Sequence, residues 1–220
     1  MRDRSEICAR LTNPGLVAVI RTPRHEDVLP VCEALLEGGI HALEITLTVP
    51  NALKAIKDAR ERLGAKAVVG AGTVTSAASS RDAIGAGAQF IVSPIMRQEV
   101  VETAHAAGCP VMLGAYTPTE AQTAYEAGAD FIKIFPADRL GATYVKALLA
   151  PLPHLRVVPT GGVDLETAPE FIKAGCVALG VGSSLLNPES IRNADWKGLS
   201  RLAKAYVDVV AKARAPANPR

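Results

Sequence analysis

No run of apolar residues in the 220-residue sequence approaches the roughly 18 that a membrane span needs, although 49% of the residues are hydrophobic. Charge of one sign is not in excess either, because 24 Lys and Arg stand against 22 Asp and Glu that are scattered along the chain. The sequence therefore has no basic stripe of the kind that a nucleic-acid surface requires. These absences predict a soluble globular protein that binds neither membranes nor nucleic acids and takes a neutral or small anionic ligand.

Paired cysteines and a signal peptide are also missing. The four cysteines, at positions 8, 32, 109 and 176, are widely spaced and form no CxxC pair, which argues against a zinc site and a disulfide framework. We interpret them as small buried hydrophobic residues. The charged N-terminal segment MRDRSEICARL has neither the apolar core nor the cleavage site of a signal peptide, so a cytoplasmic protein is expected.

One short pattern recurs along the chain. A helix-like segment is followed by a glycine, suited to a left-handed helix C-cap, and then by a short apolar run of strand character. The five copies are GGIHALEIT (38–46), AGAQFIVSP (86–94), AGCPVMLGA (107–115), AGADFIKIF (127–135) and AGCVALGVG (174–182). With the apolar runs LVAVIR, AVVGAGTV and RVVPTGG, they predict eight strands that begin near residues 17, 42, 67, 90, 111, 131, 156 and 177.

The strand spacing of about 20 to 25 residues leaves room for one helix between successive strands, which implies parallel strands. Eight such units predict a compact (β/α)₈ TIM barrel in a single domain over residues 1–220. An open doubly wound sheet is the alternative, but no GxGxxG follows the first strand. A short N-terminal helix is expected over about residues 3–12, and a mobile tail over about residues 214–220.

The segments between the strands have helical periodicity. In VLPVCEALLEGG the residues Val28, Val31 and Leu35 fall on one face, and Gly38 is expected to end the helix. The stretch WKGLSRLAKAYVDVV repeats this spacing from Trp196 onwards and is interpreted as the helix that closes the barrel.

The stretch FIKIFPADR places Lys133 among apolar residues. Side chains alternate along a strand, so Lys133 shares a face with Phe131 and Phe135 and points into the barrel, while the two isoleucines face the helices. The same alternation in ALEITL turns Glu44 inward. Because the second and sixth strands lie on opposite sides of an eight-stranded barrel, Glu44 and Lys133 are predicted to approach each other across its interior.

An ion pair without chemical use is one interpretation of these two residues. Buried pairs stabilise poorly, however, and strongly interacting charges concentrate in active sites. Desolvation disfavours the charged form of an amine and exposes its lone pair. We therefore expect Lys133 to attack a ketone and form a Schiff base, and Glu44 to carry protons to and from the substrate.

Two glycine-rich loops are expected at the rim, after the seventh and eighth strands, where barrels of this type often hold phosphate. In PTGGVD and GVGSSLL, Gly161, Gly162 and Gly182 let backbone N–H groups approach an anion, and Ser183 or Ser184 can add a hydroxyl donor. Glycines also permit tight turns, which is the alternative interpretation.

Other residues at the rim are predicted to contact the bound keto acid. Arg21 ends the first strand and offers a planar two-donor fork for a carboxylate, although a solvated rim arginine would look the same in sequence. Thr73 in GAGTV can add a hydroxyl to that carboxylate, though threonine is common at strand ends. Pro94 and Phe135 are interpreted as walls of the pocket.

No metal or cofactor is expected. The histidines lack ligand spacing and the strand ends lack paired carboxylates. Asp138 and Asp164 lie in rim loops and are interpreted as helix-capping or solvated residues.

The motifs LEITLTVPNA, VGAGTV, IVSP, FIKIFPA, PTGG and GVGSSL occur in one order and resemble those of the KDPG/KHG aldolase family over about residues 5–213. These class I pyruvate aldolases cleave 2-keto-3-deoxy-6-phosphogluconate (KDPG) or 4-hydroxy-2-oxoglutarate. The resemblance implies that Lys133 is the Schiff-base lysine and Glu44 the general acid and base. It further implies that Thr73 and Pro94 line the pyruvate site, that the two glycine loops bind phosphate, and that the protein is a metal-independent homotrimer.

One position departs from part of the family. Some members carry an arginine four residues after the glutamate, where this chain has Thr48. Others have TVP or NSP there and rely on an arginine at the end of the first strand, a role that Arg21 fits. The 2-keto-3-deoxy-6-phosphogalactonate epimer therefore remains an alternative substrate. A phosphosugar isomerase or epimerase, or a non-catalytic barrel scaffold, are more distant alternatives.

Overall fold

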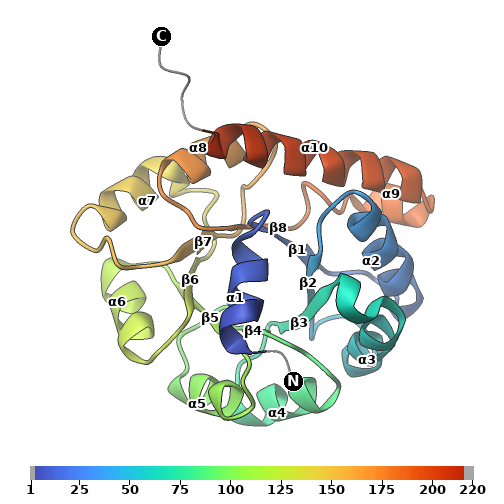
Figure 1. Ribbon diagram of the computed structural model, residues 1–220, viewed down its shortest axis with the longest axis horizontal. Helices are drawn as coiled ribbons and strands as arrows, with labels where there is room; N and C mark the ends of the chain where they lie inside the picture. Colours follow the sequence, from blue (N-terminus) through green and yellow to red (C-terminus); the bar gives the residue numbers. More distant parts are fainter. Residues whose placement is uncertain (1–2, 216–220) are drawn as a thin grey trace.

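A computed structural model describes residues 3–215 and shows eight parallel strands that form a barrel inside a ring of helices (Figure 1). The strands are β1 (Leu16–Ile20), β2 (Ala42–Thr46), β3 (Val68–Gly72), β4 (Ile91–Val92), β5 (Val111–Ala115), β6 (Phe131–Ile134), β7 (Val157–Pro159) and β8 (Leu179–Val181). Each begins within two residues of its predicted position. The strands follow chain order from β1 to β7, β8 pairs with β1, and a bridge between Thr160 and Gly180 joins the ends of the sheet. The predicted TIM barrel is confirmed.

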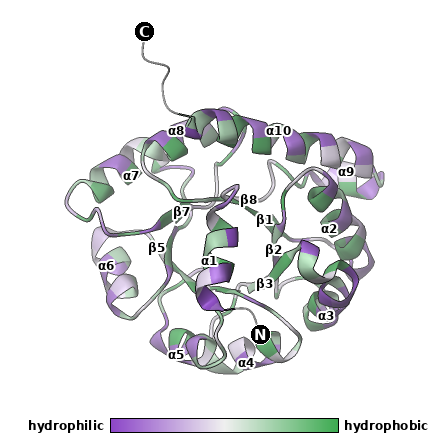
Figure 2. Cartoon of the chain, viewed as in Figure 1, coloured by the Kyte–Doolittle hydropathy of each residue, from purple (hydrophilic) through white to green (hydrophobic). Residues whose placement is uncertain are grey.

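One helix precedes the first strand, others connect successive strands on the outside of the barrel, and the last two follow β8 (Figure 1). They are α1 (Arg4–Thr12), α2 (Val28–Glu37), α3 (Ala52–Leu63), α4 (Ala77–Gly85), α5 (Gln98–Ala106), α6 (Pro118–Glu126), α7 (Gly141–Leu149), α8 (Ala168–Lys173), α9 (Pro188–Arg192) and α10 (Trp196–Arg214), with the 3₁₀ turns η1 (His25–Asp27) and η2 (Gly64–Lys66). Hydrophobic residues concentrate on the strands and polar residues on the helices (Figure 2). Within residues 3–215 no helix combines the length and the apolar character that a membrane crossing requires.

The core has an outer and an inner layer, as strand alternation predicts. Ile132 and Ile134 lie in the outer layer between strands and helices, with Leu43 and Ile45 of β2. Phe131 lies in the inner layer at the N-terminal ends of the strands. The predicted inward and outward faces of β2 and β6 are therefore confirmed.

Helix α1 closes the N-terminal end of the barrel and lies across the middle of the ring in Figure 1. Its apolar residues Ile7, Cys8 and Leu11 are buried against the inner layer. Asp130, just before β6, binds α1 through an ion pair with Arg4 at 3.4 Å. The expected N-terminal helix is confirmed, and it leaves the opposite end of the barrel for a site.

Gly38 follows the last residue of α2, so the expected end of this helix is confirmed. The left-handed residue is the next glycine, Gly39, with φ of 94°, whereas Gly38 has an ordinary right-handed φ of −76°. Gly38 is instead required for packing, because a Cβ there would lie 2.4 Å from the Ser200 carbonyl oxygen and 2.5 Å from the Ala203 Cβ of α10. Gly38 thus allows α2 and α10 to approach closely.

The expected start of a mobile tail at residue 214 is wrong for Arg214. This residue belongs to α10, and its guanidinium donates to the Thr12 carbonyl at 2.7 Å and the Val177 carbonyl at 2.6 Å. It therefore joins the end of α10 to the end of α1 and the segment before β8. Residues 216–220 of the expected tail lie outside the described residues.

The four cysteine thiols are buried and unpaired, which confirms their interpretation as core residues. Burial raises the pKa of the Cys8 and Cys109 thiols to about 11 and that of the Cys32 and Cys176 thiols to about 12.

Candidate active site

Glu44 of β2 and Lys133 of β6 meet inside the barrel. The Lys133 Nζ lies 3.6 Å from the Glu44 Oε1, and their side chains are only 6% and 2% exposed. The predicted approach of these two residues is therefore confirmed. An amine and a carboxylate this close together, shielded from bulk water, can exchange a proton through one bridging water and act together on a carbonyl.

Phe135 lies beside the Lys133 amine and is partly exposed to solvent. Its ring centroid lies 5.4 Å from the Lys133 Nζ, and 38% of the residue is exposed. Phe131, which strand alternation placed on the same face, is instead deep in the inner layer and packs against the Arg156 guanidinium at 4.2 Å. Phe135 is thus the aromatic side chain that lies next to the amine on the side of the cavity.

A cavity of about 340 Å³ opens at the C-terminal ends of the strands next to Phe135. Six predicted site residues line it together: Arg21, Phe135, Gly161, Gly162, Gly182 and Ser183. Thr73 and Pro94 are not part of this lining. The two glycine loops and Arg21 therefore share one space, and Arg21 faces the predicted phosphate loops.

The backbone after β7 requires its glycines. Gly161 and Gly162 have φ of 92° and 68°, in the left-handed region that L side chains rarely adopt. A Cβ on Gly162 would also lie 2.6 Å from the Cα of Asp138. The Ser184 hydroxyl donates to the Val163 carbonyl, so Ser183 is the better hydroxyl donor for a bound anion.

Thr73 follows β3 in a strained conformation. Its φ is 61°, which is unusual for a β-branched residue and has a cost of roughly 1 to 3 kcal/mol. Such strain gathers at functional sites, where the surrounding structure enforces it. The observation supports a role for Thr73 at the site, although the residue lies outside the cavity lined by the glycine loops.

Pro94 lies beside β5, the neighbour of the strand that carries the lysine. A Cβ on Gly114 would be 2.0 Å from the Pro94 carbonyl oxygen, and Gly114 pairs in register with Lys133. The loop after β4 therefore packs against the β5 backbone close to the amine. Gly114 was not singled out in the sequence, because its need for a small side chain arises from this tertiary contact.

Thr46 is a second residue that the sequence did not mark as part of the site. Its buried hydroxyl donates to the Ile20 carbonyl at 3.1 Å and lies 2.9 Å from the Thr48 hydroxyl. Ile20 precedes Arg21, so this contact fixes the backbone from which Arg21 projects.

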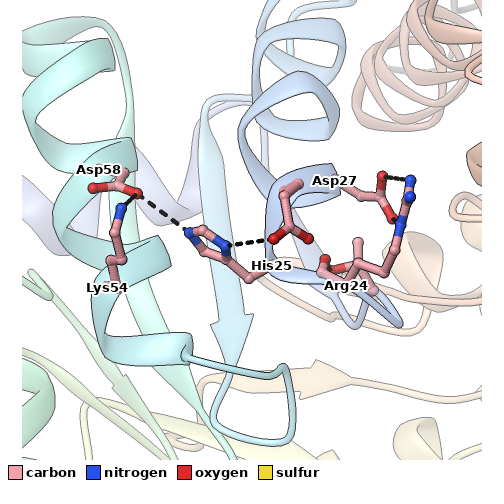
Figure 3. Close-up of polar contacts among 7 residues, drawn as sticks. Arg24, His25, Asp27, Lys54 and Asp58 are labelled. Atoms are coloured by element: carbon pink, nitrogen blue, oxygen red, sulfur yellow. Dashed lines mark hydrogen bonds and ion pairs between the residues drawn. The ribbon is translucent and has the colours of Figure 1, made fainter.

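A polar network holds the loop that follows Arg21, as Figure 3 shows. The Arg24 guanidinium donates twice to the buried Asp27 carboxylate, at 2.6 and 3.0 Å. His25 contacts Asp58 of α3 at 3.4 Å, and Lys54 contacts the same carboxylate (Figure 3). These contacts join the loop to α3 and fix the backbone that follows Arg21.

Asp164 has the structural role that was expected. Its carboxylate accepts hydrogen bonds from the backbone N–H groups of Thr167 at 2.8 Å and Glu166 at 2.9 Å. The bond from the Thr167 backbone holds the pKa of Asp164 below its ordinary value. Asp164 thus stabilises the turn before α8. Asp138 lies half exposed beside Gly162.

A model of the family described as KDPG and KHG aldolase matches residues 7–202 of the chain. The chain belongs to the KDPG and KHG aldolase family. This assignment favours an aldolase, which is a lyase, over the isomerase and scaffold alternatives.

Individual relatives agree with the family assignment. The chain is 34% identical to the 2-dehydro-3-deoxy-phosphogluconate aldolase of Treponema pallidum (strain Nichols), over 89% of the chain and 93% of that protein. It is 36% identical to the 2-dehydro-3-deoxy-6-phosphogalactonate aldolase of Escherichia coli (strain K12), over 90% of the chain and 98% of that protein. The structure of KDPG aldolase from Legionella pneumophila, with pyruvate captured as a covalent carbinolamine intermediate, matches with a TM-score of 0.83 at 30% identity, covering 90% of this chain and 97% of that one.

Proposed function

We propose that the chain is a Schiff-base aldolase that reversibly cleaves KDPG to pyruvate and glyceraldehyde 3-phosphate. The observation that carries this proposal is the buried contact of 3.6 Å between Lys133 and Glu44, next to a cavity lined by two glycine loops. A relative named for this activity, 34% identical over most of the chain, supports the choice of substrate.

The reaction assigns a step to each member of the pair. Unprotonated Lys133 adds to the C2 ketone, and loss of water with proton transfer through Glu44 gives an iminium that acts as an electron sink. Glu44 then takes the C4 hydroxyl proton, directly or through one water, and the C3–C4 bond breaks to release the aldehyde. Glu44 returns a proton to C3 of the enamine, and hydrolysis frees pyruvate and Lys133.

Substrate binding is divided between the rim residues. Arg21 and Thr73 hold the carboxylate in this proposal, with Pro94 and Phe135 as walls. Backbone N–H groups of Gly161, Gly162 and Gly182 and the Ser183 hydroxyl bind the phosphate. The positive φ values after β7 and the shared cavity support the phosphate assignment.

A second substrate is the galactonate epimer of KDPG. The relative from Escherichia coli named for that substrate is 36% identical, and Thr48 stands where other members carry an arginine. Cleavage of 4-hydroxy-2-oxoglutarate to pyruvate and glyoxylate is a further candidate. Comparison of kcat/KM for the two phosphorylated epimers and 4-hydroxy-2-oxoglutarate distinguishes these possibilities.

The central experiment traps the Schiff base. Incubation with pyruvate and borohydride is expected to leave a stable adduct on the peptide that contains Lys133, and Lys133→Met should give none. A folded wild-type protein without this adduct, and without aldol activity, would refute the proposal. Glu44→Gln is expected to retain pyruvate binding but to lose most of the cleavage activity.

We further propose that the enzyme works in the cytoplasm as a homotrimer without a metal ion or cofactor. The four unpaired thiols suit a reducing compartment. The trimer rests on the family resemblance, and sedimentation equilibrium at a mass of three chains would support it.

A further inference from the structure

We infer that Gly72 is a positioning residue for the proposed reaction, because its lack of a side chain lets the Glu44 carboxylate lie beside Lys133. The inference rests on the proposed role of Glu44 as a proton carrier and deepens it. Gly72 is the last residue of β3 and pairs in register with Thr46. It faces the same interior as Glu44 from the neighbouring strand.

The space above Gly72 is filled by Glu44. A Cβ built on Gly72 would lie 2.0 Å from the Glu44 Oε1 and 2.7 Å from both its Cδ and its Cγ. Non-bonded carbon atoms pack best at roughly 3.5 to 4.0 Å, so an alanine would displace the side chain by about 1 Å. The displaced atoms include the carboxylate oxygen that faces Lys133.

Backbone conformation does not require this glycine. Gly72 is a strand residue outside the left-handed region, in contrast to Gly161 and Gly162, whose φ values are 92° and 68°. An alanine could therefore adopt the backbone of Gly72. The conflict that it would meet arises from Glu44.

Packing against Gly72 is important because few polar contacts hold the Glu44 carboxylate in place. Among the described residues, Lys133 is the one polar partner of Glu44, and their separation of 3.6 Å exceeds that of a normal hydrogen bond, roughly 2.7 to 3.2 Å. The side chain is nevertheless almost completely buried. Its position is set by Gly72 on one side and the amine on the other.

Two other glycines provide matched controls. Gly70 lies on the same face of β3, and the three atoms nearest to a Cβ there all belong to the Phe90 ring, the closest at 2.4 Å, so Gly70→Ala crowds the core first at Phe90. Gly85 ends α4, and a Cβ there would have no atom within 4 Å, so Gly85→Ala meets open space. Gly70→Ala therefore measures the effect of crowding in the core, and Gly85→Ala measures the effect of an added methyl group that contacts nothing.

The experiment measures aldol cleavage and the exchange of pyruvate methyl protons with deuterium, which follows proton transfer at C3. Gly72→Ala is expected to lower both rates by about 100-fold, the effect of a 1 Å displacement of a reacting group. The pyruvate and borohydride adduct on Lys133 should still accumulate at long times. Gly85→Ala should match wild type, and Gly70→Ala should lose stability with a far smaller loss of exchange.

The decisive measurement is the effect of Gly72→Ala in a protein that already carries Glu44→Gln. If Gly72 acts through Glu44, Gly72→Ala should cause little further loss of exchange in that background. An equal fold loss in both backgrounds, or full activity of Gly72→Ala, would overturn the inference and leave the proposed function intact. Failure of wild type to form the adduct would instead count against the proposed function.

A folding control keeps the result interpretable. Should Gly72→Ala fail to fold, Gly72→Ala combined with Glu44→Ala removes all three of the atoms nearest to the new Cβ. Recovery of a cooperative unfolding transition in the double variant would support the steric argument. Failure of the double variant to fold under conditions in which the Glu44→Ala single variant folds would overturn it.

Discussion

At the residue scale, the Lys133 and Glu44 charges depend on each other for burial. Removal of one partner leaves the other charge desolvated without compensation, which typically costs about 3 to 5 kcal/mol. We expect Lys133→Met to lower the free energy of unfolding by an amount of this order, measured by urea denaturation. Lys133→Met combined with Glu44→Gln should recover part of the loss, and equal stability of the single and double variants would contradict this account.

Arg21 offers a second test at this scale, because it shares its cavity with the phosphate loops. If Arg21 binds the carboxylate, Arg21→Ala should raise the KM for pyruvate in the direction of aldol addition by about 10-fold or more, as the loss of a charged hydrogen bond implies. A rise confined to the KM for glyceraldehyde 3-phosphate would assign Arg21 to the phosphate instead. Steady-state kinetics with each substrate varied separates the two outcomes.

At the element scale, Gly38 controls the contact between α2 and α10. A Cβ there would lie 2.5 Å or less from atoms of α10, and overpacking of this kind costs roughly 1 to 3 kcal/mol. Gly38→Ala should therefore lower the free energy of unfolding, whereas the matched Gly85→Ala should not. Unchanged stability of Gly38→Ala in urea denaturation would show that the two helices can separate without cost.

The docking of α1 should depend on pH through His41. Its Nε2 lies 3.1 Å from the Arg10 carbonyl of α1, and burial lowers the pKa of His41 below its usual 6.5. Between pH 6.5 and the lower folded value, the unfolded chain binds more protons, so this contribution to stability is lost as the pH falls. The urea midpoint of His41→Gln should fall less on acidification than that of wild type. An identical pH dependence of the two proteins would exclude His41 as the cause.

The sequence predicts those elements that follow from local periodicity and chain order. Alternation in β2 and β6 is a property of a few consecutive residues, and the order of strands in a barrel places Glu44 opposite Lys133. The need for a residue without a side chain at Gly38 could not be predicted this way, since it depends on Ser200 and Ala203 in a distant helix.

The remaining differences have the same cause. Arg214 lies in a segment with little apolar character, and its two carbonyl partners come from the opposite end of the chain and from the segment before β8. The requirement for Gly72 arises from a side chain on the neighbouring strand. Contacts between residues far apart in the chain leave no periodic pattern, so sequence alone did not reveal them.

At the scale of the whole molecule, the buried thiols report cooperative unfolding. Their raised pKa values, about 11 for Cys8 and Cys109 and about 12 for Cys32 and Cys176, leave little reactive thiolate near neutral pH. A thiol reagent at pH 8 should therefore modify the native protein far more slowly than the denatured protein. All four should react together as urea unfolds the chain. Earlier reaction of Cys8 alone would indicate that α1 opens independently of the barrel.

The closure of the barrel by α1 has a consequence for the order of events during turnover. Because Ile7, Cys8 and Leu11 fill the N-terminal end of the barrel, we expect substrate to reach Lys133 from the C-terminal end, where the cavity opens. In the proposed reaction the half of the substrate bonded to Lys133 is the deeper one, and the phosphorylated half lies nearer the rim. The aldehyde must then leave before pyruvate, so the product nearer the rim is released first and the deeper one second.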